Sequence, residues 1–232
     1  MIGLLGKKLG QTRVYDDQGN VTVVTAVLAG PNVVLQCKTR ETDGYNAVQL
    51  GFDAQKEHRL TKPLLGHVKK RGGTPVKRIR EFRDFSLPVK PGDKLGVDVF
   101  AKGDFVDAIG VTKGRGFEGV VARHAFAGGD STHGAKGWHR RSGAIGQRLF
   151  PGTVMRGMRM PGHLGQVRRT VQNLEVIQVR PEDNVLLIKG AIPGAKGDYV
   201  VIRESKKRPK GTKFVKGPAQ TPKKGKAGAA KK

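Results

Sequence analysis

The chain has 232 residues, of which 44 are Lys or Arg and 19 are Asp or Glu, so that its formal net charge is +25. A free protein gains nothing from so large a charge of one sign, because self-repulsion opposes compaction, whereas a polyanion such as a nucleic-acid backbone offsets it. Hydrophobic residues make up 37% of the chain and 34 residues are glycine, which excludes a core at every position and predicts segments that a partner orders.

The N-terminal segment Met1–Gly10 begins with a few apolar residues that Lys7 and Lys8 interrupt. It lacks the apolar run of a secretory signal peptide, and no stretch of the sequence approaches the ~18 apolar residues of a membrane span. We therefore expect a cytoplasmic protein that has no membrane partner.

A first group of strands is expected early in the chain. Val21–Leu28 is rich in β-branched residues, Val33–Cys37 and Ala47–Phe52 follow it, and Asp16–Asn20 is typical of a hairpin turn. Cys37 is the only cysteine, which excludes an intrachain disulfide and a cysteine-based zinc site.

A basic insertion is expected at residues 56–83, where 10 Lys or Arg residues stand against two acidic residues and few apolar positions. Within it, Pro63–Lys70 has room for one short helix. Further along the chain, Val97–Phe100 and Phe105–Ile109 combine β-branched and aromatic residues, and they predict additional strands.

The central segment, residues 113–169, has a different composition, with 11 Lys or Arg, two acidic residues and 13 glycines. An irregular segment of this length is uncommon inside a compact domain unless it has a function of its own. Glycine allows the backbone to approach another surface closely, and the interleaved cations supply phosphate contacts. We therefore expect a loop that packs on RNA instead of on protein.

A second group of strands follows the central segment, at Leu174–Val179, Val185–Ile188 and Tyr199–Ile202. Short strands separated by turns that contain Pro, Gly or Asp predict a mainly β fold with a small closed or half-closed barrel. Residues 206–232 contain 11 Lys or Arg and no acidic residue, which is typical of a polycationic low-complexity tail.

The predicted organisation has three parts. Residues 1–112 and 170–204 form the β-barrel core, which carries the basic insertion at 56–83. Residues 113–169 form the extended RNA-binding loop, and residues 205–232 form a basic disordered tail.

Two stretches of the central segment carry the side chains that suit RNA. Gly134–Gly143 places Trp138 and His139 among three cations, a combination suited to splayed bases and crowded RNA backbones. Met155–Gly162 alternates methionine with arginine. Core packing is the usual role of methionine, but here every neighbour is Arg, Gly or Pro, which favours a contact with RNA.

Three patterns that would indicate an enzyme or a metal site fail in their context. Gly114–Gly119 matches the dinucleotide fingerprint G-x-G-x-x-G, but cations occupy the turn and no βαβ alternation surrounds it. Of the histidines in the segment, only His133 and His139 approach the paired spacing of zinc ligands. Asp130, Ser131 and His133 are adjacent in a flexible stretch that would not hold a catalytic triad. We expect no enzyme, no cofactor, no metal and no small-molecule substrate.

Motifs spread over residues 1–204 form one pattern, to which the glycines of the dinucleotide match also belong. They are Met1–Thr12, then Phe100, Asp107, Gly110, Thr112, Gly114–Gly116, Gly119 and Arg123, and finally Thr132–Gly134, Gly143–Gln147 and Lys189–Gly194. In this order the motifs resemble the third large-subunit ribosomal protein family, in its bacterial-type form.

The resemblance implies a β-barrel of the type shared by translation proteins, lying on the surface of the large ribosomal subunit. It implies that the loop reaches through ribosomal RNA (rRNA) towards the peptidyl transferase centre, with Gly114–Arg123 entering the loop and Gly143–Thr153 near its tip. It also implies a structural constituent that nucleates early assembly and whose partners are large-subunit rRNA and neighbouring ribosomal proteins. Leu149 replaces a glutamine that is methylated in some bacterial members, so that modification is not expected. The tail after Glu204 exceeds the usual family length.

The residues expected to contact RNA are polar or aromatic residues of the N-terminal segment and the loop. They are Lys7, Lys8, Lys113, Arg115, Arg123, His133, Lys136, Trp138, His139, Arg140, Arg141, Gln147, Arg148, Arg156, Arg159, His163, Arg168 and Arg169.

Two other functions are compatible with part of the sequence. A free basic RNA chaperone or another nucleic-acid-binding protein would share the charge and the glycine content, as would a binder of heparin-like polymers or acidic membranes. A nucleotide-dependent enzyme would use Gly114–Gly119. The motif from Phe100 to Arg123 favours the ribosomal interpretation over both.

Overall fold

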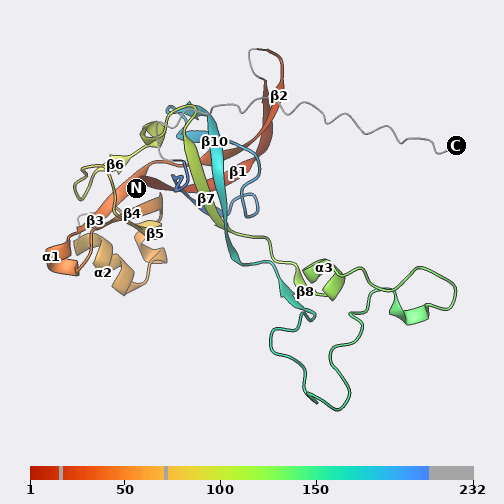
Figure 1. The fold of residues 1–232 in the computed structure, drawn as a ribbon. Helices are drawn as coiled ribbons and strands as arrows, with labels where there is room; N and C mark the ends of the chain where they lie inside the picture. The colour runs from red at the N-terminus through yellow and green to blue at the C-terminus, as the bar shows by residue number, and fades with distance from the viewer. Residues whose placement is uncertain (16–17, 71–72, 209–232) are drawn as a thin grey trace.

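The computed structural model describes residues 1–15, 18–70 and 73–208. Its centre is a closed barrel of antiparallel strands in the order β1-β12-β7-β10-β11-β2 (Figure 1). The barrel strands are β1 (Gly3–Tyr15), β2 (Val21–Leu28), β7 (Phe105–Val111), β10 (Arg168–Arg180), β11 (Val185–Lys189) and β12 (Tyr199–Glu204). The first and last of these strands pair with each other, with Gly3 opposite Arg203.

The interior of the barrel is filled by aliphatic side chains that alternate along the strands. Leu4, Val27, Val106, Leu186 and Ile202 are wholly buried, each from a different strand. Because successive residues of a strand point to opposite faces, one apolar residue in every two is enough to fill a small barrel. This explains how a chain with few apolar residues still has a core.

A second sheet of four strands, in the order β5-β4-β3-β6, lies against the outside of the barrel. Its strands are β3 (Asn32–Lys38), β4 (Ala47–Ala54), β5 (Val76–Arg83) and β6 (Lys94–Leu95). Its short helices are α1 (Arg40–Asp43), η1 (Glu57–Arg59) and α2 (Lys62–Lys70), and η2 (Val97–Val99) follows β6. Leu5 of β1 packs with Phe52 and Phe82 of this sheet, which attaches the sheet to the barrel.

A buried amide also fastens the two sheets together. The side chain of Asn32 donates to the carbonyls of Leu5 and Ala29, at 3.1 and 2.9 Å, and accepts a hydrogen bond of 3.0 Å from the amide of Leu5. Asn32 is fully buried, so its polar atoms would be costly without these partners. The second sheet is therefore held in one position relative to β1.

The segment between β7 and β10 extends away from the barrel as a long loop (Figure 1). It contains β8 (Gly116–Glu118), α3 (Val120–His124), η3 (Lys136–Trp138) and β9 (Gly162–Leu164). β8 and β9 pair with each other as a two-stranded ribbon, apart from the barrel.

The mainly β class and the closed barrel are confirmed. Seven of the eight expected strands and the short helix near Pro63–Lys70 are present; six of the strands match within two residues, and β10 begins six residues before the predicted Leu174. The expected hairpin is also present, because β1 and β2 pair with Tyr15 opposite Val21. The predicted turn Asp16–Asn20 includes residues 16 and 17, which lie outside the described residues.

The predicted strand at Val97–Phe100 is wrong, because Val97–Val99 is a turn of 3₁₀-helix. Side chains three residues apart lie on one side of such a turn, and Val97 and Phe100 both pack into the barrel core. Two further differences concern the second sheet. β3 and β4 belong to it instead of to the barrel, and the basic insertion supplies one of its edges, β5.

The chain after β12 begins with residues that contact the barrel. Ser205 is buried; its amide donates to the Phe105 carbonyl at 3.1 Å, and its hydroxyl donates to the side chain of Asn173 at 2.6 Å. The guanidinium carbon of Arg208 lies 4.8 Å from the centre of the Phe105 ring. The remainder of the expected tail, residues 209–232, lies outside the described residues.

Across the described parts of the chain, none of the helices has both the length and the apolar character needed to cross a membrane.

Candidate nucleic-acid interface

The base of the loop is a continuation of the β7–β10 pair. Beyond Val111, which lies opposite Arg168, the amide of Thr112 donates to the Val167 carbonyl at 3.0 Å. The amide of Gln166 then donates to the Thr112 carbonyl at 3.1 Å. The two arms of the loop are thus joined by backbone hydrogen bonds from the barrel to the β8–β9 ribbon, and their direction is fixed by a rigid support.

A close backbone approach at Gly165 requires glycine. Gly165 has a φ of +83°, and a Cβ atom there would stand 2.2 Å from the carbonyl oxygen of Lys113 and 2.9 Å from the Cα of Gly114. A larger residue would force the two arms apart, since both neighbours are backbone atoms. The glycine content of the segment therefore has a structural cause at this position.

Arg123 and His124, on helix α3, join the two arms of the loop at a second place, farther from the barrel than Gly165. Arg123 Nη1 donates to the Met160 carbonyl at 2.6 Å, and His124 Nε2 lies 3.1 Å from the same oxygen. Gly162 leaves the space for this contact, because a Cβ there would stand 2.7 Å from Arg123 Nη1. Arg123 is expected to contact RNA, and in the structure one nitrogen of its half-buried guanidinium holds the two arms together.

Beyond this closure the chain forms an irregular lobe around Trp138. The amide of Gly129 donates to the His139 carbonyl at 3.1 Å, so the chain before and after residues 130–138 meets there. The Arg141 guanidinium carbon lies 4.7 Å from the centre of the Trp138 ring. A Cβ atom at Gly128 would stand 2.3 Å from the same His139 carbonyl oxygen, and the φ of +82° there suits glycine.

The lobe contains a shallow hollow that the tryptophan and the arginine share. Its walls include Phe126, Gly129, Trp138, Arg141 and Ser142. An indole with a guanidinium stacked on it offers an extended planar surface, and a nucleobase packs well on such a surface. Trp138 and Arg141 of the predicted stretch Gly134–Gly143 thus lie together at this hollow, and their contact with RNA stays a prediction.

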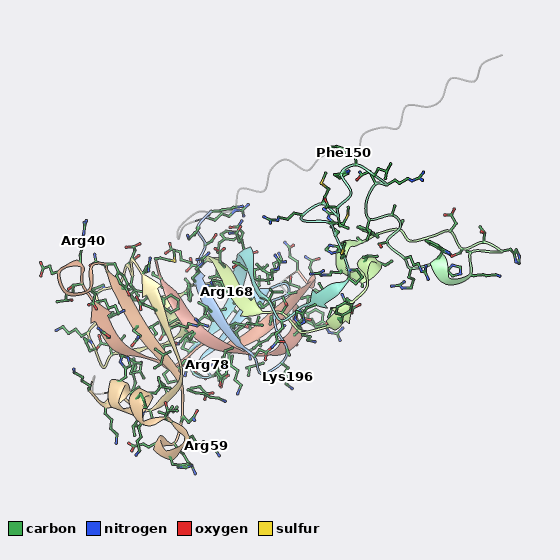
Figure 2. The ribbon with its side chains drawn as sticks, turned by 90° about the horizontal axis from the view of Figure 1, so that it is seen from below. Arg40, Arg59, Arg78, Phe150, Arg168 and Lys196 are labelled. Atoms are coloured by element: carbon green, nitrogen blue, oxygen red, sulfur yellow. The ribbon has the colours of Figure 1, made fainter. Side chains whose placement is uncertain are left out.

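The outer part of the loop exposes large apolar side chains. Phe150 and its neighbour Leu149 are 90% and 87% exposed, and Phe117 of β8 is 80% exposed. Figure 2 shows Phe150 far out on the loop, away from the barrel. Such exposure is unusual in a water-facing segment and marks a surface that a partner covers.

Sequence reasoning did not select Phe150, Leu149 or Phe117 as functional residues. The signal that would have found them is an aromatic or aliphatic residue in a segment with too few apolar neighbours to build a core. Leu149 was considered only as a replacement for a modified glutamine.

The positive charge of the loop is largely uncompensated. Of its two acidic residues, Glu118 lies 3.4 Å from Arg115, in an ion pair on the surface. Within the described residues, Arg115 is the only cation of segment 113–169 that forms an ion pair. Apart from Arg123, which donates to the Met160 carbonyl, the other cations are therefore available to an external anion.

Fifteen of the eighteen expected contact residues are exposed. They are Lys113, Arg115, His133, Lys136, Trp138, His139, Arg140, Arg141, Gln147, Arg148, Arg156, Arg159, His163, Arg168 and Arg169. His163 lies on β9, and Arg168 and Arg169 begin β10. The structure thus spreads these residues along one extension instead of gathering them in a pocket.

Lys8 is placed differently from the other expected residues. It is buried, and its Nζ atom donates to the carbonyls of Ile192 and Gly194 at 2.6 and 2.8 Å. Burial, together with the nearby charge of Lys113, lowers the pKa of Lys8 from its usual value, while Asp198 acts in the opposite direction. Lys8 therefore fastens the turn before β12 to β1, and we do not include it in the interface.

Residues that could form a metal centre do not converge. In the ranges that the structure describes, no three His, Cys, Asp or Glu side chains form a group able to hold a metal ion. His133 and His139, the pair nearest to zinc spacing, are both exposed side chains of the lobe.

Comparisons with known proteins show the family of the chain. A family model described as ribosomal protein L3 matches residues 57–185. The large ribosomal subunit protein uL3 of Deinococcus radiodurans is 49% identical over 207 residues, which cover 89% of this chain and 96% of that protein. The chain belongs to the ribosomal protein L3 family. The uL3 proteins of Akkermansia muciniphila and Brachyspira pilosicoli are 49% and 47% identical, over 89% and 90% of this chain and 99% and 95% of their own lengths.

Family membership explains the motif that runs from Phe100 to Arg123. In the structure this L3 motif passes from the barrel core at Phe100, along β7, to the closure of the loop at Arg123. Its glycines at 114, 116 and 119 line the start of the loop, where no parallel βαβ unit is present among the described elements. The resemblance to a dinucleotide fingerprint therefore has no structural counterpart.

Proposed function

We propose that this chain is a structural constituent of the large ribosomal subunit that binds rRNA through the loop at residues 113–169. The observation that carries the proposal is the unpaired positive charge of this loop together with its exposed Trp138, Leu149 and Phe150. Cations offset phosphate repulsion, and exposed aromatic rings stack on bases that are not paired. Both are needed where RNA strands converge.

The barrel and the outer loop have different roles, because the barrel is rigid. The barrel and its hydrogen-bonded neck hold the base of the loop, while the irregular outer part adapts to the RNA. The role that we propose is architectural, and any chemistry belongs to the RNA.

Two finer parts of the proposal rest on the family resemblance. We propose that the outer loop, around Gly143–Thr153, lies near the peptidyl transferase centre, and that the protein acts early in subunit assembly. Neighbouring ribosomal proteins are its further partners. The length of the loop and the exposure of its outer apolar residues support the first part.

Sedimentation through a sucrose gradient at high salt tests the proposal, because salt screens loose electrostatic attachment. The tagged protein should remain with the large subunit, and RNA crosslinks should concentrate on one region. A free RNA chaperone would instead move to the top fractions with crosslinks scattered over many RNAs, and that outcome would refute the proposal.

Two double variants distinguish a specific role of the loop from an effect of the total positive charge of the protein. Replacing Arg140 and Arg141 by Ala removes two exposed cations of the lobe and the stacking on Trp138, and should slow subunit maturation. The same change at Arg40 of α1 and Arg59 of η1, exposed cations on short helices that accompany the second sheet (Figure 2), removes equal charge and should have a smaller effect. Equal effects of the two variants would contradict a specific role of the lobe.

A further inference from the structure

Tyr199 occupies a junction between the barrel and the second sheet. It begins β12, and its hydroxyl donates to the carboxylate of Asp53 at the end of β4. Its ring meets the edge of Phe52, with 6.3 Å between the ring centres and an interplanar angle of 83°. Tyr199 therefore links the two sheets at a second point besides the buried Asn32.

Three cations from two elements surround this one ring. The guanidinium carbon of Arg78 lies 4.8 Å from the ring centre, and the Nζ atoms of Lys77 and Lys7 lie at 5.5 and 6.0 Å. Arg78 and Lys77 come from β5, whereas Lys7 comes from β1 of the barrel. We call Lys7, Lys77, Arg78 and Tyr199 the junction cluster.

The charge of the junction cluster is only partly balanced by the protein, because three cations stand beside the single carboxylate of Asp53. Asp53 is the acidic side chain at the cluster, and its carboxylate already accepts from Tyr199. In the described ranges, Lys7, Lys77 and Arg78 make no ion pair with an acidic residue. Cations held around a single ring repel one another, and their cost falls when an anion joins them.

The chemistry of the cluster selects the kind of anion. A guanidinium presents a planar fork of donors that fits two phosphate oxygens, and ammonium groups add point charges from the sides. The side chains of Lys77 and Arg78 are exposed and that of Lys7 is half-buried, so the site is open to a long polymer.

We propose that the junction cluster binds a backbone phosphate of RNA, as a contact separate from the loop. This inference rests on the proposed function, since it takes the partner to be the same rRNA. One phosphate that contacts Lys7 on the barrel and Arg78 on the second sheet ties the two sheets together. RNA binding thereby adds a third fastening to those made by Asn32 and by Tyr199.

Lysine acetylation of the full chain, with and without deproteinised large-subunit rRNA, tests the inference by mass spectrometry. We expect RNA to slow the acetylation of Lys7 and Lys77 about threefold or more, as it does that of Lys136 in the loop. Lys62 and Lys102, exposed lysines elsewhere on the body, serve as references and should change little. Inorganic phosphate without RNA should protect none of these lysines.

The possible outcomes separate the two proposals. Protection of Lys136 without protection of Lys7 and Lys77 overturns the junction site and leaves the loop interface standing. Absence of protection at all three lysines overturns both. Full protection of Lys7 and Lys77 by inorganic phosphate alone would assign the cluster to a free anion and overturn its assignment to RNA.

A matched pair of variants tests the phosphate contact of the junction cluster independently. Lys77→Gln with Arg78→Gln removes two charges at the junction, and Arg40→Gln with Arg59→Gln removes two exposed charges from the short helices α1 and η1. For a labelled RNA duplex, the slope of log affinity against log salt should become shallower by about 1 to 2 in the junction variant only. Equal slopes in the two variants, with thermal unfolding unchanged, would contradict a specific phosphate contact.

Discussion

Asp107 and Arg203 face each other directly across β7 and β12, and their side chains form an ion pair of 3.3 Å between Oδ2 and Nη2. The Asp107 side chain is 1% exposed and that of Arg203 is 20% exposed. The other carboxylate oxygen of Asp107 accepts from the amide of Asn173 at 3.1 Å, on the neighbouring strand β10. One buried carboxylate thus joins three consecutive strands of the barrel, which gives this motif residue a structural role.

Replacing Asp107 by Asn should lower the free energy of unfolding by about 3 kcal/mol, because it leaves the guanidinium of Arg203 largely buried without a counter-charge. Arg203 Nε already has no hydrogen-bond partner among the described residues, so Arg203 has few other contacts that could compensate for the lost ion pair. Urea denaturation measures the loss. Asp98→Asn makes the same chemical change at an exposed position and should cost much less; a similar cost would contradict the role assigned to Asp107.

Replacing Gly165 by Ala should open the neck of the loop, because the added Cβ meets the backbone of Lys113 and the left-handed φ is strained for alanine. Hydrogen exchange at the amides of Thr112 and Gln166 should accelerate by roughly tenfold or more, which corresponds to about 1.4 kcal/mol. Gly119→Ala is the control, since nothing lies within 4 Å of its added Cβ. Unchanged exchange in the Gly165 variant would show that the close approach is not required.

Tyr199 should ionise at unusually high pH, because burial and its hydrogen bond to Asp53 both raise its pKa above the usual value of 10.0. Absorbance at 295 nm follows this titration in a variant in which Tyr15 and Tyr45 are Phe. Since the folded pKa is the higher one, the contribution of Tyr199 to stability is complete below pH 10 and is lost as the pH rises through the folded pKa. Tyr199→Phe should remove this alkaline loss; a midpoint at the usual value would contradict the prediction.

Two truncations should differ in thermal stability. Removal of residues 209–232 leaves every described contact in place, and the melting temperature should not change. Removal from Ser205 onward also deletes the hydrogen bonds of Ser205 to Phe105 and Asn173, and should lower the melting temperature by several degrees. Differential scanning calorimetry compares the two. Equal melting temperatures would show that Ser205 contributes nothing to the barrel.

Sequence patterns predicted the strands that are rich in β-branched residues, and they failed where packing overrides local preference. Strand β1 was not predicted because glycines and lysines interrupt it. A Cβ at Gly3 would stand 2.3 Å from the ring of Phe82, and one at Gly6 would stand 2.7 Å from Val27, so the glycines mark where other elements cross the strand. These close approaches are tertiary contacts, which the local propensities of the residues do not reveal.

The site was predicted in its composition but not in its detail. The density of Lys, Arg and Gly located the loop, because that composition is incompatible with a protein core. It did not separate Lys8 and Arg123, each of which donates to a carbonyl of the chain, from cations such as Arg140 that are exposed. That distinction depends on which carbonyl groups the fold brings near each side chain.

The pairing of β1 with β12 determines the order in which parts of the fold form while the chain is synthesised. The strand made first, β1, has its final neighbour β12 only after almost all of the described chain has left the ribosome. The sheet formed by β3, β4, β5 and β6 is contiguous in sequence and can assemble earlier. The basic loop therefore emerges while the barrel is still open, so a nascent chain exposes its cations to RNA before the scaffold that aims them has closed.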